Sequence, residues 1–239
     1  TNAHRSDWMF ALVRTDFDSK PQQGITFLML PMSKPGVEVK PIFSIDGLHH
    51  LNEVYFTNAR VPVSQRIGEE NKGWSYAKYL LGHERTAIAN IPANRMLIDN
   101  LRRFTETAAT GDGYLLSENT VFRNRLDQLE IELDALDWNQ SLVLAAMESG
   151  GSAGDAASML KIVGSELQQK LEELRVEAVA YYALPFDTRQ LRSETNETAY
   201  GPDFSLRAVS DYNFGRASSI YGGSNEIQRN VLAKSMLGF

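Results

Sequence analysis

Two short segments of this 239-residue chain bring together residue types that could do chemistry. The first is residues 81–86 (LGHERT), where Glu84 and Arg85 are neighbours on an otherwise apolar helical pattern. Adjacent helical residues are about 100° apart, so these two side chains do not face each other as an i,i+4 pair would. One of them is expected to point toward the core or a cleft, and acid–base chemistry is what such a pair could serve. A solvated helix edge is the alternative.

The second segment is residues 220–229 (IYGGSNEIQR), where a glycine pair joins two helical patterns. Ser224 is a good N-cap residue and Glu226 falls in the first turn of the helix that follows. Exposed backbone N–H groups at such a helix start could receive a carbonyl, phosphate or flavin oxygen. A capped helix–helix turn that binds no ligand is the alternative.

Several other kinds of site are not expected. The chain has no cysteine and four histidines, and the adjacent His49 and His50 would point to opposite faces of a strand, so we expect no metal site. The GxGxxG, GxxxxGK[ST] and GxSxG patterns are absent from the sequence. A net charge of −6 argues against a nucleic-acid surface, and no apolar run approaches the ~20 residues of a membrane span. A cytoplasmic location is expected.

The first quarter of the chain must supply strands. Residues 8–15 and 24–31 are rich in β-forming side chains, residues 37–42 alternate apolar and polar positions, and residues 51–61 form a further strand pattern closed by Pro62. The connections between them are short, which favours antiparallel pairing.

Helical periodicity begins near Gly68 and continues to the end of the chain. One run is interrupted at Pro92, a second reaches about Ala109, and a third carries the stripe Phe122, Leu126, Leu129, Leu133 and Leu136. A fourth carries Leu160, Val163, Leu167, Leu171, Leu174 and Ala178, residues 185–202 are irregular, and helices follow over residues 206–220 and up to Leu237. The sequence therefore predicts an α+β chain in two domains, a small antiparallel β domain at residues 1–66 and an up-down helical bundle at residues 67–239.

Several motifs in this order resemble the acyl-CoA dehydrogenase family. Residues 1–3 (TNA) are similar to the end of the family's Trp-Ile-Thr-Asn motif, and residues 53–56 (EVYF), 61–62 (VP) and 68–74 (GEENKGW) to its passage from β domain into C-terminal helices. Residues 220–229 resemble its terminal YxGxxxIQR signature. The resemblance covers essentially the whole chain and is strongest to bacterial dehydrogenases of the pimeloyl-CoA type.

The resemblance implies a flavoenzyme that binds FAD between its β domain and its helical bundle. A carboxylate removes the α-proton of an acyl-CoA while the β-hydrogen leaves as hydride to the flavin, which yields a trans-2-enoyl-CoA. Electrons then pass to an electron-transferring flavoprotein. Self-association as a homodimer or homotetramer, and a role in fatty acid metabolism, are also implied.

The resemblance also identifies a candidate base. Many family members carry Glu directly after the Tyr of the terminal motif, where this chain has Gly222, which cannot accept a proton. A smaller branch places its Glu on the first helix of the C-terminal domain, just before an Arg, and the matching residues here are Glu84 and Arg85. We therefore expect Glu84 to be the base and Arg85 to position the site. Burial in an apolar acyl tunnel would raise the pKa of Glu84, which suits a base.

Six residues besides Glu84 and Arg85 are matched to family positions. Thr1, Ser224 and Glu226 match positions near the flavin, whereas Tyr221 and Gly223, with Gly222 between them, match positions at the thioester end.

The sequence also departs from the family. The RxxFG segment, whose Arg reaches the FAD pyrophosphate, is not recognisable in residues 94–104, and residues 181–202 replace the QxxGGxG segment. The family's N-terminal helical domain and half of its β domain are not in this chain, so we expect the 239 residues alone to bind FAD poorly and to be inactive. Two rival functions remain: a non-catalytic subunit of a heteromeric dehydrogenase, and an acyl-CoA oxidase that reacts with oxygen.

Overall fold

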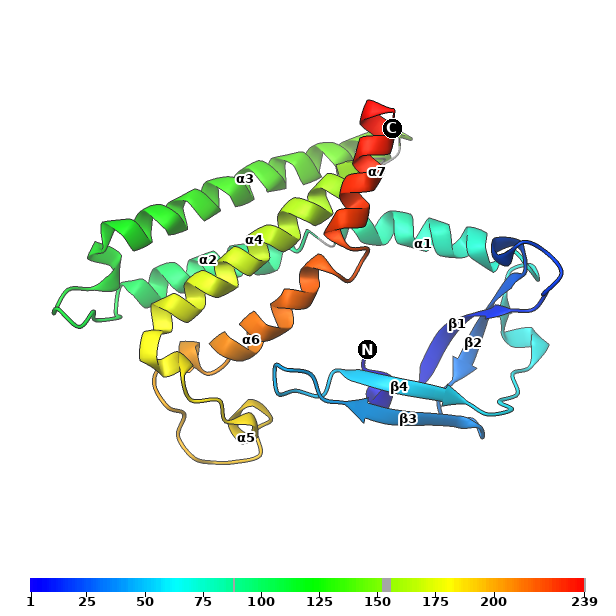
Figure 1. Ribbon diagram of the computed structural model, residues 1–239, viewed down its shortest axis with the longest axis horizontal. Helices are drawn as coiled ribbons and strands as arrows, with labels where there is room; N and C mark the ends of the chain where they lie inside the picture. Colours follow the sequence, from blue (N-terminus) through cyan, green and yellow to red (C-terminus); the bar gives the residue numbers. More distant parts are fainter. Residues whose placement is uncertain (88, 152–155, 239) are drawn as a thin grey trace. The chain divides into compact units, whose positions relative to one another are not determined.

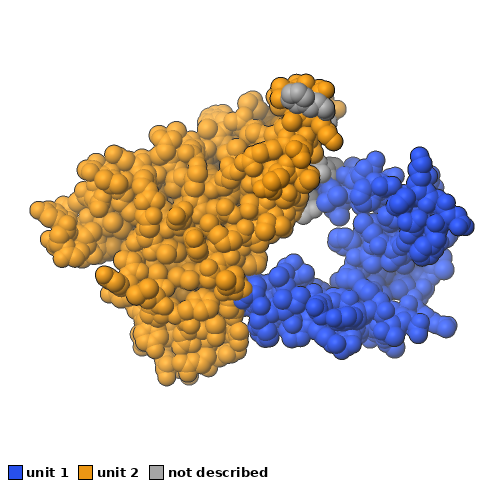
Figure 2. All heavy atoms as spheres, in the orientation of Figure 1, with its two compact units in different colours: residues 1–44, 48–83 blue, residues 45–47, 84–239 orange. Residues whose placement is uncertain are grey.

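The computed structural model describes residues 1–87, 89–151 and 156–238, with the side chains of residues 82–87 outside the described part. The chain forms two compact units, shown in blue and orange in Figure 2. The first contains Thr1–Ser44 and Leu48–His83, and the second contains Ile45–Gly47 and Glu84–Phe239. The domain boundary after residue 66 stays a prediction.

The first unit is built on two small antiparallel sheets. Strands β1 (Trp8–Arg14), β2 (Ile25–Pro31) and β5 (Arg66–Ile67) form one sheet in the order β1-β2-β5, and β3 (Val37–Ile42) pairs with β4 (Leu51–Phe56) in the other. Helix α1 (Gly73–Ala87) begins in this unit and continues into the second. The antiparallel pairing predicted from the short connections is therefore confirmed.

The prediction that a strand runs over residues 51–61 is wrong at its C-terminal end. Strand β4 stops at Phe56, and Asn58 has a φ of 50° in the left-handed region. An extended ladder cannot continue through that backbone conformation, so the chain turns there.

The second unit is helical. Its α-helices are α2 (Ile91–Thr105), α3 (Thr120–Glu148), α4 (Ala156–Val179), α5 (Thr188–Leu191), α6 (Ala208–Gly215) and α7 (Asn225–Leu237). Short 3₁₀ turns lie between them at η4 (Leu116–Glu118), η5 (Ala180–Ala183), η6 (Asp203–Ser205) and η7 (Arg216–Ser219). In the first unit, 3₁₀ turns are η1 (Ala3–Arg5), η2 (Pro21–Gln23) and η3 (Val63–Gln65). Helix α4 packs against α2, α3, α6 and α7, and Figure 1 shows α2, α3 and α4 running lengthwise side by side. The predicted α+β fold with a C-terminal helical bundle is confirmed.

The bundle core is made by the leucine stripes that the sequence predicts. The stripe on α3 is buried at all five of its positions, and four of the leucines predicted on α4 are at most 1% exposed. These α4 residues are Leu160, Leu167, Leu171 and Leu174. Such long antiparallel apolar faces bury enough surface to stabilise the helices that carry the terminal turn.

The predicted interruption near Pro92 is confirmed. Asn90 has a φ of 52°, and Pro92 lies in the first turn of α2, where its missing N–H removes no helical hydrogen bond. Ala89 at this junction is fully buried against α4. A Cβ at Gly164 would lie 2.6 Å from the Ala89 Cα, so glycine is what allows the junction to approach α4.

Two helix predictions need correction. Residues 185–202 are not wholly irregular, because Asp187 accepts a hydrogen bond from the Arg189 backbone N–H and caps the short helix α5. The helix predicted over residues 206–220 ends at Gly215 and tightens into η7, where the Arg216 guanidinium donates to the Tyr212 carbonyl. None of the described helices combines the length and apolar composition that a bilayer crossing needs.

Candidate functional site

The turn at residues 221–224 joins η7 to α7. Gly222 and Gly223 have φ angles of 68° and 90°, a backbone conformation that side chains with a Cβ rarely adopt. Ser224 then caps α7, its hydroxyl accepting a hydrogen bond from the Ile227 backbone N–H at 3.4 Å. The glycine pair is therefore needed to reverse the chain directly ahead of the cap.

Gln228 holds this turn from the inside. Its side chain is buried, and its Nε2 donates to the Gly222 carbonyl at 3.2 Å. On its other side the Ser158 hydroxyl donates to Gln228 Oε1 at 2.7 Å, which ties the turn to α4. A Cβ at Gly223 would lie 2.4 Å from Gln228 Nε2, so a larger residue there would displace the amide. Fixing the Gly222 carbonyl inward also fixes the orientation of the peptide that follows it.

Asn225 anchors the first residue of α7 in the same way. Its Oδ1 accepts from the Lys161 ammonium at 2.6 Å and from the Ser165 hydroxyl at 3.2 Å. Lys161 is fully buried, and burial lowers the pKa of its ammonium group while the nearby Glu226 carboxylate opposes that change. A buried ammonium group needs a polar partner, so Lys161 and Asn225 together set where α7 starts.

The turn presents unused backbone donors. The N–H groups of residues 222–225 donate to no acceptor in the part of the chain that the structure describes. They lie at the N-terminus of a 13-residue helix, where the helix dipole favours negative charge. A carbonyl oxygen that becomes negatively charged during a reaction would be stabilised by such donors.

Glu226 adds an acid beside these donors. Its carboxylate is exposed, and hydrogen bonds from its own backbone N–H and from the Ser224 hydroxyl lower its pKa. The neighbouring Arg229 guanidinium forms an ion pair with Glu166 of α4. Glu226 therefore remains ionised and competes with any bound anion for the positive end of the helix.

Tyr221 lies at the start of the turn with 45% of its surface exposed. Partial burial raises the pKa of its phenol, and the negative charge of Glu172 on α4 raises it further. The phenol therefore stays protonated at neutral pH and can donate a hydrogen bond. The charge of Glu172 therefore acts on Tyr221 although the two residues are far apart in the sequence.

The site residues predicted from the sequence fall into three groups. Tyr221, Gly222, Gly223 and Ser224 form the turn at residues 221–224, called the terminal turn below, and Glu226 follows in the first turn of α7. Thr1 is exposed in the first unit. The side chains of Glu84 and Arg85 lie outside the described residues. Within the described ranges, no three His, Asp or Glu residues are grouped so that they could hold a metal ion.

Sequence reasoning missed the residues that hold the turn in place. Lys161 interrupts the apolar run of residues 159–163 (MLKIV), a signal that a charged group enters the bundle, yet its partner Asn225 is 64 residues away. Ser158 and Gln228 are 70 residues apart and carry no signal of their pairing. These contacts are visible only once α4 and α7 are packed together.

Replacing Gln228 with alanine is expected to destabilise the helical unit by about 1–3 kcal/mol, because the change leaves the Gly222 carbonyl and the Ser158 hydroxyl without partners. Urea unfolding followed by the helical circular dichroism signal measures this difference. Gln128→Ala, on the exposed face of α3, is the matched control and is expected to change stability by less than about 0.5 kcal/mol. Equal losses for the two variants would contradict the anchoring role of Gln228.

Comparisons with known proteins give a consistent result. The family model described as "Acyl-CoA dehydrogenase, C-terminal domain" matches residues 71–237. Acyl-CoA dehydrogenase IpdE1 of Mycobacterium tuberculosis is 31% identical over 99% of this chain and 56% of its own length. The mitochondrial long-chain specific acyl-CoA dehydrogenase of Sus scrofa is 26% identical over 99% of this chain and 52% of its own length. The chain thus spans about half the length of the curated relatives it matches.

Solved structures share the fold. The Tcur3481-Tcur3483 steroid ACAD superposes with a TM-score of 0.83 at 22% identity, covering 100% of this chain and 58% of that one. The ChsE4-ChsE5 complex from Mycobacterium tuberculosis gives a TM-score of 0.79 at 24% identity, covering 99% and 58%. At these identities the likeness concerns the fold alone.

Proposed function

Because the chain belongs to the acyl-CoA dehydrogenase family, we propose that the protein catalyses FAD-dependent α,β-dehydrogenation of an acyl-CoA thioester. The observation that carries the proposal is the terminal turn, where two glycines and a capped helix present four backbone N–H groups that donate to no acceptor among the described residues. Members of the family are FAD-dependent flavoproteins. The curated relatives are about twice as long as this chain, so the activity is proposed for the protein in its full natural length.

The residues of the turn fit the ring end of FAD. The polar edge of an isoalloxazine ring is rich in hydrogen-bond acceptors, and the N–H groups of Ser224 and Asn225, which donate to no described acceptor, form a matching donor pair. We propose that Thr1, Ser224 and Glu226 are cofactor-binding residues. Glu226 weakens this fit electrostatically, since its carboxylate stays ionised.

The pyrophosphate end of FAD fits less well. Three arginines of α2, in the segment where relatives supply a phosphate-binding Arg, are already bound within the chain. Arg95 binds Asp134 at 2.5 Å, Arg102 binds Asp127 at 2.7 Å, and Arg103 binds Asn100 at 2.5 Å. We therefore assign no pyrophosphate contact to these residues.

The chain's own residues would divide the reaction as follows. Glu84 accepts the α-proton of the acyl group, because Gly222 has no side chain to do so. The backbone donors of Gly222 and Gly223 bind the thioester oxygen, where negative charge grows as the proton leaves. Tyr221 lines the thioester end, and Arg85 helps to position the site. FAD, when bound, would supply the oxidising chemistry, because its ring can take up a hydride. We further propose an electron-transferring flavoprotein as the electron acceptor, and a cytoplasmic location stays a prediction.

Anaerobic addition of a panel of acyl-CoAs to the purified full-length protein is expected to bleach the flavin absorbance with at least one chain length. The physical reason is that hydride transfer reduces the flavin and removes its visible absorption. Octanoyl-CoA, a short acyl-CoA and a long one form a suitable first panel. Bound flavin that no acyl-CoA bleaches would contradict the proposed reaction. Hydrogen peroxide released in air would instead assign the protein to the oxidases.

A second candidate function is that of a non-catalytic subunit in a heteromeric dehydrogenase. Glycine at the position of the more common base and the occupied arginines of α2 favour it. Among structures with this fold is one titled as a complex of two proteins, ChsE4 and ChsE5. Protein that carries no flavin alone, but forms a larger and active assembly with a paralogous partner, would support this function over the first.

A further inference from the structure

The Lys161 side chain on α4 is fully buried. Its Nζ donates to Asn225 Oδ1 at 2.6 Å, and no carboxylate forms an ion pair with it in the part of the chain that the structure describes. Burying an ammonium group lowers stability unless the group is well paired, and a well-packed apolar side chain at such a position is often at least as stable. Stability therefore does not explain why a lysine lies here.

Asn225 connects this ammonium group to the terminal turn. It is the first residue of α7, so its side chain binds Lys161 while its backbone N–H belongs to the donor pair that we propose for the flavin. The Asn225 amide is held in place by Ser165, whose hydroxyl lies 3.2 Å from Asn225 Oδ1 and 3.1 Å from Nδ2. The ammonium charge is therefore one residue away from the donors at which negative charge would bind.

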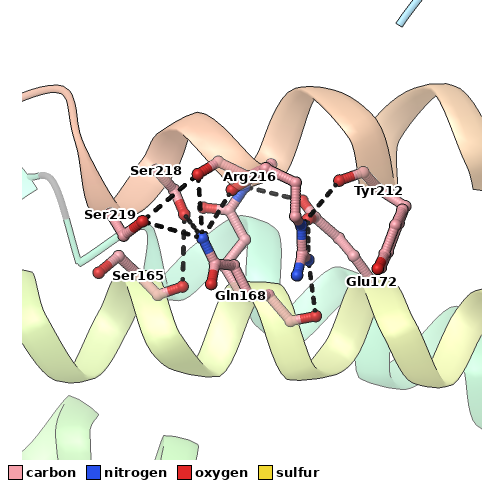
Figure 3. Close-up of polar contacts among 9 residues, drawn as sticks. Ser165, Gln168, Glu172, Tyr212, Arg216, Ser218 and Ser219 are labelled. Atoms are coloured by element: carbon pink, nitrogen blue, oxygen red, sulfur yellow. Dashed lines mark hydrogen bonds and ion pairs between the residues drawn. The ribbon is translucent and has the colours of Figure 1, made fainter. Parts of the chain in front are cut away.

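The segment that precedes the turn is fixed to the same helix. The Ser218 hydroxyl of η7 donates to the Ser165 carbonyl at 3.4 Å, and Figure 3 shows these serines where η7 meets α4. The Gln169 amide of α4 donates to the hydroxyls of Ser218 and Ser219 at 3.3 Å. Because η7 precedes the turn and α7 follows it, both ends of the turn are held against the helix that carries Lys161.

The other charged groups that act on Lys161 lie on α4 and α7. Burial lowers the pKa of Lys161, as does the Arg229 guanidinium, whereas the carboxylates of Glu226 and Glu166 raise it. Glu166 is paired with Arg229, and Glu226 is exposed, so water and salt screen its charge. The buried charge of Lys161 is screened less, so it acts on the turn from the interior.

We propose that the Lys161 ammonium group, acting through Asn225, raises the reduction potential of FAD bound at the terminal turn. Hydride transfer adds two electrons and one proton to the ring, which then carries one more negative charge. A positive charge behind the donors stabilises this reduced form more than the oxidised form. The inference rests on the proposed function, because it takes the backbone N–H groups of Ser224 and Asn225 as partners of the ring. Lys161 is a positioning residue that does not touch the cofactor.

The midpoint potential of the flavin in the full-length protein, measured against a reference dye without substrate, tests this role. Lys161→Met keeps nearly the length of the side chain and removes its charge. This variant is expected to lower the equilibrium constant for flavin reduction about tenfold, which is a shift of about 30 mV for a two-electron couple. Lys170→Met, the same change at an exposed position of α4, is expected to leave the potential unchanged.

Asn225→Asp separates the effect of charge from the effect of packing. The aspartate keeps an acceptor for the Lys161 ammonium group, but its negative charge cancels that of the ammonium beside the turn. The potential is expected to fall in this variant as well, because the net charge behind the donors is lost. If Lys161 only anchored α7, Asn225→Asp would keep the wild-type potential.

The outcomes separate this inference from the proposed function. An unchanged potential in Lys161→Met, or a fall in that variant that Asn225→Asp does not share, would overturn the role of the Lys161 charge. If acyl-CoA still bleaches the flavin in that case, the dehydrogenase proposal stands while this inference falls. Potentials that fall as expected in a protein whose flavin no acyl-CoA bleaches would keep the role of Lys161 and refute the proposed reaction. Full-length protein that binds no flavin would overturn both proposals.

Discussion

Glu84→Gln is expected to slow acyl-CoA-dependent bleaching of the flavin by on the order of 10²–10⁴-fold, the usual contribution of a general base. Glutamine has nearly the shape of glutamate but does not accept the α-proton. The chain offers no replacement at the position after Tyr221, because glycine stands there. Stopped-flow absorbance under anaerobic conditions measures the rate, with flavin content determined for each variant.

The control for this experiment is Glu148→Gln, at the exposed C-terminal end of α3, which is expected to leave the rate unchanged. Binding of octyl-CoA thioether to both variants separates loss of the base from loss of the site. Equal bleaching rates for wild type and Glu84→Gln would leave the dehydrogenase proposal standing and would refute Glu84 as its base.

Glu172 is expected to make the helical unit less stable as the pH rises from about 4.5 to about 7. Burial raises its pKa from 4.5 to about 7, with the Gln168 amide and the Arg216 guanidinium opposing that rise and the Asp211 charge adding to it. At 1.36 kcal/mol per pKa unit, the full effect is about 3 kcal/mol.

The sign of the change in stability with pH depends on whether the folded or the unfolded chain holds the proton. Below pH 4.5 Glu172 is protonated in both the folded and the unfolded chain, so its titration does not change the free energy of unfolding. Between the two pKa values the folded chain keeps the proton that the unfolded chain has lost, so stability falls with rising pH. Above the pKa of Glu172 in the folded chain, the loss of stability is complete and no longer changes with pH. Removing the titrating group therefore stabilises the protein at alkaline pH and has little effect at acid pH.

Glu172→Gln isolates this effect, because the amide keeps the size and hydrogen bonding of the side chain without titrating. Urea unfolding at several pH values between 4.5 and 8, followed by helical circular dichroism, gives the free energy of unfolding for both proteins. The variant is expected to gain about 3 kcal/mol on wild type across this range. Parallel pH profiles would show that Glu172 titrates normally in the folded protein.

Helices and turns could be predicted from the sequence where a pattern of neighbouring residues determines them. Leu126, Leu133 and their neighbours recur at helical spacing, so their burial on one face of α3 follows from the sequence. The terminal turn is equally local, since Gly222 and Gly223 permit the left-handed backbone and Ser224 caps the helix. The errors fall at element ends such as Asn58, where one backbone angle stops a strand whose side-chain pattern continues.

The sequence by itself determined the family, the fold class and which residues form the terminal turn, because motif order, apolar period and helix capping act over a few residues. The tertiary structure alone decided what holds and surrounds that turn. Lys161 meets Asn225 across 64 residues and Ser158 meets Gln228 across 70, where α4 packs on α7. Glu172 becomes a buried acid only because Gly215 leaves space for its carboxyl group at the crossing of α4 and α6. Burial and partner choice of this kind depend on which helices pack together, and no local pattern specifies that.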